Sequence, residues 1–116
     1  MDTKKEEKRL PDGVTQEQMN QLARQHGQVF PVRVKKDGKQ FCGLFRKPKL
    51  SDMSAAAAVG MNDPLAAGDL VYNSCKLAAD PEMDSDDEVH LAAVKSVQSL
   101  FRVLEAEVGE AFGVGV

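Results

Sequence analysis

The chain has 116 residues and a formal net charge of −3, which suits a single domain whose core needs neither a disulfide nor a metal to fold. No stretch approaches the roughly 18 consecutive apolar residues of a membrane-spanning helix, and no signal-like apolar stretch follows the charged start. We therefore expect no membrane partner and a cytoplasmic location. Residues 1–49 hold 12 Lys and Arg against 6 Asp and Glu, whereas residues 50–116 hold 3 against 12. This division of charge favours a binding protein over a catalyst.

The N-terminal part of the chain predicts a charged tail and then a short helix. Residues 1–13 mix both charges without an apolar stripe, so we expect them to be disordered. A single α+β domain should follow over residues 14–110. Thr15 and Gln18 have the spacing of a capping box and predict a helix that ends near His26.

A two-stranded antiparallel β-hairpin is predicted around Asp37-Gly38, a pair typical of two-residue turns. Pro31 cannot donate to a ladder, so the first strand should lie at the edge of a sheet. With a two-residue loop, one face of the hairpin is apolar. That face holds Phe30, Val32, Val34, Phe41 and Phe45.

Three helices should follow and pack on one face of the hairpin. Ser51 is expected to cap the first, which ends at Gly60. Asp63-Pro64 begins the second, whose apolar pattern continues to about Ala79.

The last predicted helix has the clearest apolar stripe in the chain. Ser85 and Glu88 repeat the capping-box spacing at its start, and the stripe continues to Val108. Leu100 and Phe101 lie midway along this stripe, so we expect both to be largely buried. Residues 111–116 alternate glycine with apolar residues and predict a flexible C-terminal tail.

The acidic run of residues 80–88 does not have the pattern of a calcium loop. Position 6 of such a loop would be Ser85 in place of Gly, and position 12 would be Leu91 in place of Glu. We interpret the run as a loop and the acidic cap of a helix. No metal site is predicted.

No catalytic group is predicted either. His26 and His90 have no neighbouring nucleophile or orienting group in the sequence. Cys42 and Cys75 are too sparse for a disulfide framework or a zinc site, and we interpret them as two reduced thiols. We therefore expect neither an enzyme nor a cofactor.

The basic hairpin raises an alternative function, a small nucleic-acid-binding module that uses residues 33–49. Its Lys and Arg side chains could follow a phosphate backbone. However, Phe41 and Phe45 fall on the face that should be buried, and the isoelectric point of about 5.3 is acidic. Both observations weigh against nucleic acid as a partner.

The order of these elements resembles that of small phage and prophage tail assembly chaperones. The resemblance covers about residues 28–108. It rests on the hairpin end Phe45-Arg46-Lys47-Pro48, the Ala-rich helix, the restart Asn62-Asp63-Pro64, the acidic loop and the long final helix. It implies a non-enzymatic protein of the bacterial host cytoplasm that binds the tape measure protein during tail morphogenesis. Tail tube subunits are a second candidate partner.

We expect two groups of residues to bind the partner. The basic group lies on the hairpin and the apolar group lies near the C-terminus. A free hairpin edge and the opposite charges of the two halves also predict a homo-oligomer. The expected partner-binding residues are Arg33, Lys35, Arg46, Lys47, Phe101, Leu104, Val108 and Phe112.

Overall fold

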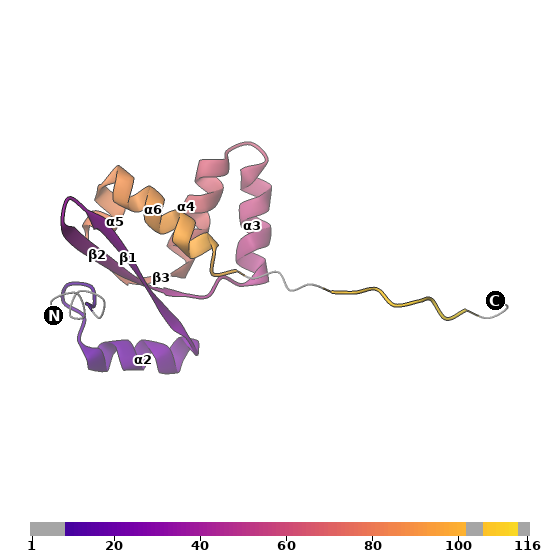
Figure 1. Ribbon diagram of the computed structural model, residues 1–116, viewed down its shortest axis with the longest axis horizontal. Coiled ribbons are helices and arrows are strands. Elements are labelled where there is room, and N and C mark those ends of the chain that lie inside the picture. The colour runs from indigo at the N-terminus through magenta and orange to yellow at the C-terminus, as the bar shows by residue number, and fades with distance from the viewer. Residues whose placement is uncertain (1–8, 102–105, 114–116) are drawn as a thin grey trace.

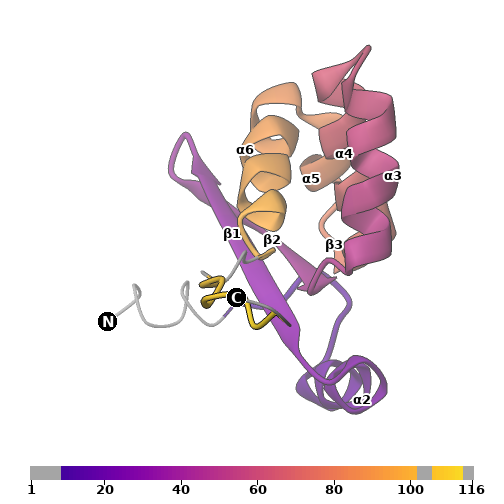
Figure 2. The same ribbon diagram turned by 90° about the vertical axis from the view of Figure 1, so that its right-hand side faces the viewer.

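The structure, a computed structural model, describes residues 9–101 and 106–113 (Figure 1). In chain order its elements are α2 (Gln16–His26), β1 (Val29–Lys36), β2 (Lys39–Arg46), α3 (Leu50–Gly60), α4 (Pro64–Cys75), β3 (Lys76–Ala79), α5 (Glu82–Ser85) and α6 (Asp87–Gln98). The strands form an antiparallel sheet in the order β1-β2-β3. Helices α3, α4 and α6 gather on one side of this sheet and α2 lies on the other (Figures 1 and 2). This is the α+β fold class that the sequence predicts.

The hairpin of β1 and β2 forms in the predicted register. Val34 pairs with Phe41, and the two residues of the turn, Asp37 and Gly38, have φ values of 51° and 78°. Positive φ at both positions gives a turn whose twist matches that of the flanking strands. Strand β1 lies at the edge of the sheet, as Pro31 predicts.

Helix α2 begins and ends where its local signals predict. The Oγ1 atom of Thr15 accepts a hydrogen bond from the backbone N–H of Gln18 at 3.1 Å. In return, the backbone N–H of Thr15 donates to Oε1 of Gln18 at 2.9 Å, which completes the capping box. Gly27, with a φ of 82°, follows the last residue of the helix.

The predicted cap of α3 is wrong. Ser51 lies inside the helix, which begins at Leu50. The carboxylate of Asp52 instead accepts from the backbone N–H of Lys49 at 2.8 Å. The side chain of Asp52, in the first turn, thus accepts a hydrogen bond from the backbone N–H of Lys49, the N-cap residue. Helix α3 therefore begins without a hydroxyl side chain at its N-cap.

The predicted extent of α4 and the two-stranded sheet are also wrong. Helix α4 ends at Cys75, and residues 76–79 pair with β2 as a third strand. Ala78 pairs with Leu44 and Ala79 with Gly43. A two-stranded ribbon is marginally stable and leaves the second edge of β2 unpaired. Residues 76–79 therefore form a strand on the free edge of β2, although their apolar pattern continues that of α4.

The start of α6 differs from the predicted one by one residue. Ser85 ends the short helix α5, and Asp86 is the N-cap of α6. Its Oδ1 atom accepts from the backbone N–H groups of Glu88 and Val89 at 3.0 and 3.1 Å. Its Oδ2 atom accepts from Nζ of Lys36 at 2.8 Å. The acidic run thus holds a short helix and a cap that also contacts β1.

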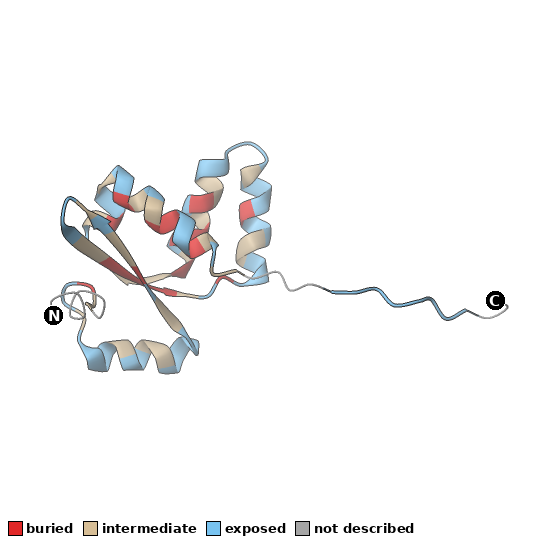
Figure 3. Cartoon of the chain, in the orientation of Figure 1, coloured by how far each residue is buried: buried red, intermediate tan, exposed pale blue. Residues whose placement is uncertain are grey.

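The long final helix is shorter than the sequence predicts. Helix α6 ends at Gln98, and Leu100 and Phe101, which follow it, are only half-buried. Residues 106–113 contain neither helix nor strand and are all exposed (Figures 1 and 3). Leu104 lies outside the described residues.

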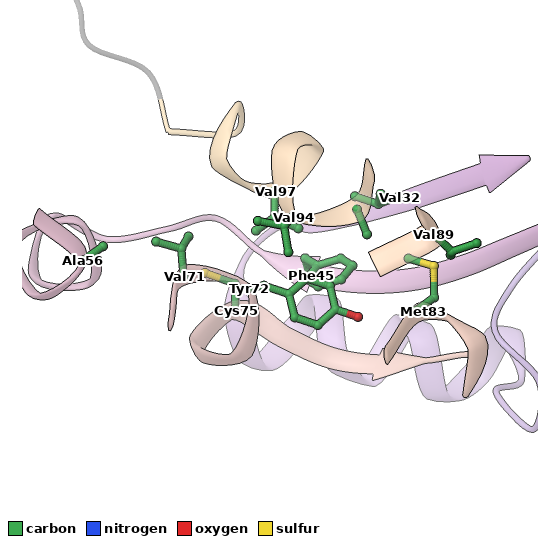
Figure 4. Close-up of a cluster of buried hydrophobic side chains, with 11 residues drawn as sticks. Val32, Phe45, Ala56, Val71, Tyr72, Cys75, Met83, Val89, Val94 and Val97 are labelled. Atoms are coloured by element: carbon green, nitrogen blue, oxygen red, sulfur yellow. The ribbon is translucent and has the colours of Figure 1, made fainter. Parts of the chain in front are cut away.

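The core lies between the sheet and the helices α4 and α6 (Figure 4). The rings of Phe45 and Tyr72 meet in a tilted arrangement with their centroids 5.1 Å apart. Gly68 allows α4 and α6 to approach closely, because a Cβ atom on it would lie 2.7 Å from Cγ1 of Val94. The buried members of this cluster are Val32, Phe45, Ala56, Val71, Tyr72, Cys75, Met83, Val89, Ala93, Val94 and Val97.

The last residues of the expected disordered tail are bound to the sheet. Nη1 of Arg9 donates to Oδ2 of Asp80 at 2.7 Å, and the backbone N–H of Asp12 donates to Oδ1 of Asp80. Asp80 is completely buried. Residues 1–8 of that tail lie outside the described residues.

The core arrangement predicts a large difference between two phenylalanines. Phe45→Ala should lower the free energy of unfolding by about 3–5 kcal/mol, because the ring is fully buried. Phe112→Ala should change it by no more than about 0.5 kcal/mol, because that ring is exposed. Urea unfolding of both variants measures the difference, and equal losses would contradict the described packing.

Candidate protein-binding groove

An apolar groove lies between the first half of α4 (residues 64–69) and α6 (residues 87–98), and we call it the α4–α6 groove. It has a volume of about 340 Å³. Leu65 and Leu91 both line it, and they are 71% and 45% exposed. Two large apolar side chains thus face solvent beside a hollow of the size of a small ligand pocket.

The groove follows from the way α6 places its apolar residues. Val89, Ala93 and Val97 recur every four residues and are all buried. Leu91 lies two residues from Val89 and Ala93, and therefore on another face of the helix. Gly68 also lines the groove, and its lack of a side chain lets α4 come close to Val94 of α6.

A second apolar hollow continues this surface toward α3. It has a volume of about 510 Å³ and shares Pro64 and Gln98 with the α4–α6 groove. Met61, which lines it, is 87% exposed. The two hollows together form an apolar surface across α3, α4 and α6.

His90 sits at the polar rim of the groove and uses both ring nitrogens. Nε2 lies 2.6 Å from Oδ1 of Asp69, and Nδ1 lies 2.9 Å from the carbonyl oxygen of Met83. Both partners only accept hydrogen bonds, so both bonds form only when the ring is doubly protonated. Burial lowers the pKa of His90, but the bonds to Asp69 and Met83 outweigh burial and hold the pKa above its usual value.

A network of hydrogen-bonded side chains contacts the ring of His90 through Tyr72. Tyr72 packs edge-on against it, with the ring centroids 4.6 Å apart. The hydroxyl of Tyr72 donates to Oδ1 of Asp84 at 2.9 Å, and Nζ of Lys76 lies 2.8 Å from the other oxygen. Burial and the bond to Asp84 raise the pKa of Tyr72. The network joins α4, β3, α5 and α6.

The two cysteines do not contribute to the groove. Cys42 and Cys75 are free and completely buried. Burial raises the pKa of both thiols, which disfavours the reactive thiolate. Within the described part of the chain, no cluster of three His, Cys, Asp or Glu side chains could hold a metal ion.

Two of the four predicted basic residues, Arg33 and Arg46, make contacts within the fold. Arg33 donates to the backbone oxygen of Arg9 at 3.1 Å. Arg46 is paired with Asp52, with a distance of 2.8 Å between Nη1 and Oδ2. Lys35 and Lys47 are exposed on β1 and after β2. Arg33 and Arg46 therefore help to hold the fold together.

The described members of the predicted apolar set, Phe101, Val108 and Phe112, do not line the groove. Phe101 is half-buried just after α6, and Leu104 lies outside the described residues. Val108 and Phe112 are almost fully exposed on the extended segment.

The sequence interpretation missed Leu65, Leu91 and the pair of His90 with Asp69. A signal for the two leucines was present, because each is a large apolar residue off the buried stripe of its helix. No local signal could show that His90 contacts Asp69, since the two lie on different helices whose packing had to be known first.

Comparison with known proteins gives the fold only. No protein-family model matches the chain, and no curated protein matches it. Among solved structures, the chain is similar to the uncharacterised protein rbstp2171 from Bacillus stearothermophilus, with a TM-score of 0.53 and 22% identity. The match covers 82% of this chain and 99% of that one. Among the residues that the structure describes, no helix has the length and apolar character needed to cross a bilayer.

The bonds of His90 predict a specific dependence of stability on pH. Because the pKa is raised in the folded state, the contribution to stability is complete below the ordinary pKa of about 6.5. It is lost as the pH rises through the higher folded value. The free energy of unfolding should therefore fall as the pH rises above about 6.5, by about 1.4 kcal/mol for each unit by which the folded pKa exceeds the ordinary one.

Urea unfolding across this pH range measures the effect in two variants. Asp69→Asn should flatten the dependence, because it removes the carboxylate that accepts from Nε2. Asp87 also lines the groove but is not one of the two hydrogen-bond partners of His90, so Asp87→Asn should retain the pH dependence. An unchanged slope in Asp69→Asn would contradict the role of this pair.

Proposed function

We propose that the protein is a non-enzymatic tail assembly chaperone of a phage or prophage, and that its α4–α6 groove binds helical segments of the tape measure protein. The observation that carries this proposal is the apolar groove with Leu65 and Leu91 exposed beside it. A hydrophobic groove between helices is a typical binding site for the apolar face of an amphipathic helix.

The dimensions of the surface are consistent with such a partner. Helix α6, which lines the groove from Asp87 to Gln98, has 12 residues and is therefore about 18 Å long. Anchor residues at positions i, i+4 and i+7 of a bound helix extend over about 10 Å. The groove can thus hold two or three anchors, and the hollow next to Met61 offers room for a further turn.

The polar groups near the groove support binding over catalysis. His90 would need a free ring nitrogen to act as a general base, but both of its nitrogens have partners. Asp84 is held by Tyr72 and Lys76. The buried thiols of Cys42 and Cys75 are poor nucleophiles.

The chaperone proposal implies a setting and further partners. The protein would act in the cytoplasm of the bacterial host, before the tape measure protein is enclosed by tail tube subunits. Those subunits remain a second candidate partner.

The alternative of nucleic-acid binding by residues 33–49 has less support. The ring of Phe45 is completely buried and Phe41 packs against the core, so neither offers a free face for stacking. Arg46 is engaged by Asp52. Salt distinguishes the two proposals, because binding to phosphates weakens steeply with salt and binding in an apolar groove does not.

Co-expression with the tape measure protein encoded in the same genome, followed by pull-down, tests the chaperone proposal. Leu91→Asp should reduce capture by at least about tenfold, since a charge would replace an apolar contact worth more than 1.4 kcal/mol. Leu50→Asp is the matched control, because Leu50 is 72% exposed but lies outside the groove. Capture should change little between low and high salt.

Two results would contradict the proposal. One is a tape measure protein that is equally soluble and not bound in the presence of this chain. The other is equal loss of capture in Leu91→Asp and Leu50→Asp, which would exclude a specific role for the groove.

A further inference from the structure

The exposed large apolar residues of the described chain form two separate groups. Five of them belong to the layer of α3, α4 and α6: Leu50, Val59, Met61, Leu65 and Leu91. The other two, Val108 and Phe112, lie on residues 106–113. That segment extends away from the folded part and is exposed along its length (Figures 1 and 3).

We infer that residues 106–113 of one copy bind in the α4–α6 groove of a second copy. The groove is an apolar hollow without a cover, and the segment carries two apolar side chains without a packing partner in the described chain. This contact does not depend on the proposed tape measure partner.

The spacing of the two apolar residues suits one continuous binding site. Val108 and Phe112 are four residues apart, so they share a face if the segment becomes helical. They also share a face if it stays extended, because alternate residues of a strand point the same way. They would be about 6 Å apart along a helix and about 13 Å apart in an extended chain. Both distances fit within the roughly 18 Å length of α6, which lines the groove from Asp87 to Gln98.

The charges favour one end of the groove for the segment. Glu107 and Glu110 flank Val108, and Lys95 lies on the groove two turns after Asp87 along α6. The acidic segment would therefore lie toward Lys95 and away from Asp87.

The direction of the segment favours a second copy over the same chain. In Figure 1 residues 106–113 lie apart from α4 and α6, the helices that line the groove. A segment of one copy in the groove of the next is a head-to-tail contact, which can close into a ring or continue. Two anchor residues bury much less than the roughly 1,200 Å² of a stable interface, so the association should be weak and dependent on concentration.

Two single variants and their mixture test this inference by sedimentation velocity, with no other protein present. The wild-type chain should associate increasingly from about 10 μM to several hundred μM, as expected of a small interface. Phe112→Asp, which alters the segment, and Leu91→Asp, which alters the groove, should each remain monomeric. Their equimolar mixture should form a dimer and stop there, because only one intact groove and one intact segment can meet.

Leu50→Asp should associate as the wild type does, and circular dichroism should show all three exposed-site variants folded. A wild-type chain that is monomeric throughout this range would overturn the inference. So would a mixture that stays monomeric while the wild type associates, since another interface between copies would then be involved. Association of either single variant at the wild-type level would have the same consequence. Because no tape measure protein is present, these outcomes are independent of the proposed chaperone function.

Discussion

The buried carboxylate of Asp80 joins three parts of the chain, and the position of the helices depends on it. It accepts hydrogen bonds from the backbone of Cys42, from the side chain of Arg9 and from the backbone of Asp12. The backbone N–H of Asp80 donates to the carbonyl of Cys42, so the residue continues the contact of β3 with β2 after the strand ends. Its own carbonyl accepts from Met83 and begins α5. Because a buried charge is costly unless it is fully paired, these contacts fix the sheet, the N-terminal segment and the start of α5 together.

The elements that the sequence predicts correctly depend on signals within a few residues. Thr15 and Gln18 cap α2 reciprocally, and the turn at Asp37-Gly38 determines the register of the hairpin. Asp63 accepts from the backbone of Ala66 at the start of α4, as the Asp-Pro pair predicts. In each case the interaction that specifies the structure lies inside the motif itself, so no knowledge of tertiary packing is needed.

The elements that the sequence does not predict depend on contacts between distant residues. Residues 76–79 continue the apolar pattern of α4, and only the free edge of β2 makes them a strand. The apolar stripe that begins in α6 continues to Val108 in the sequence, yet the helix ends at Gln98. The candidate site has the same origin, because the α4–α6 groove exists only once Gly68 has allowed the two helices to approach. Its exposed leucines could have been noticed as residues off the stripe, but their position beside a common hollow could not.

The surface proposed to bind a partner differs from the groups that stabilise the fold. Charged groups such as Arg46, Asp84 and Asp86 are engaged in ion pairs or a helix cap, whereas the exposed leucines of the groove contribute little to the core. A photo-reactive amino acid at position 91, with position 50 as the control, tests this separation most directly in cells that also produce the tape measure protein. If the tape measure protein binds in the α4–α6 groove, position 91 should give a cross-link to it and position 50 should give none. Cross-links of equal yield from both positions, or from position 50 alone, would contradict it.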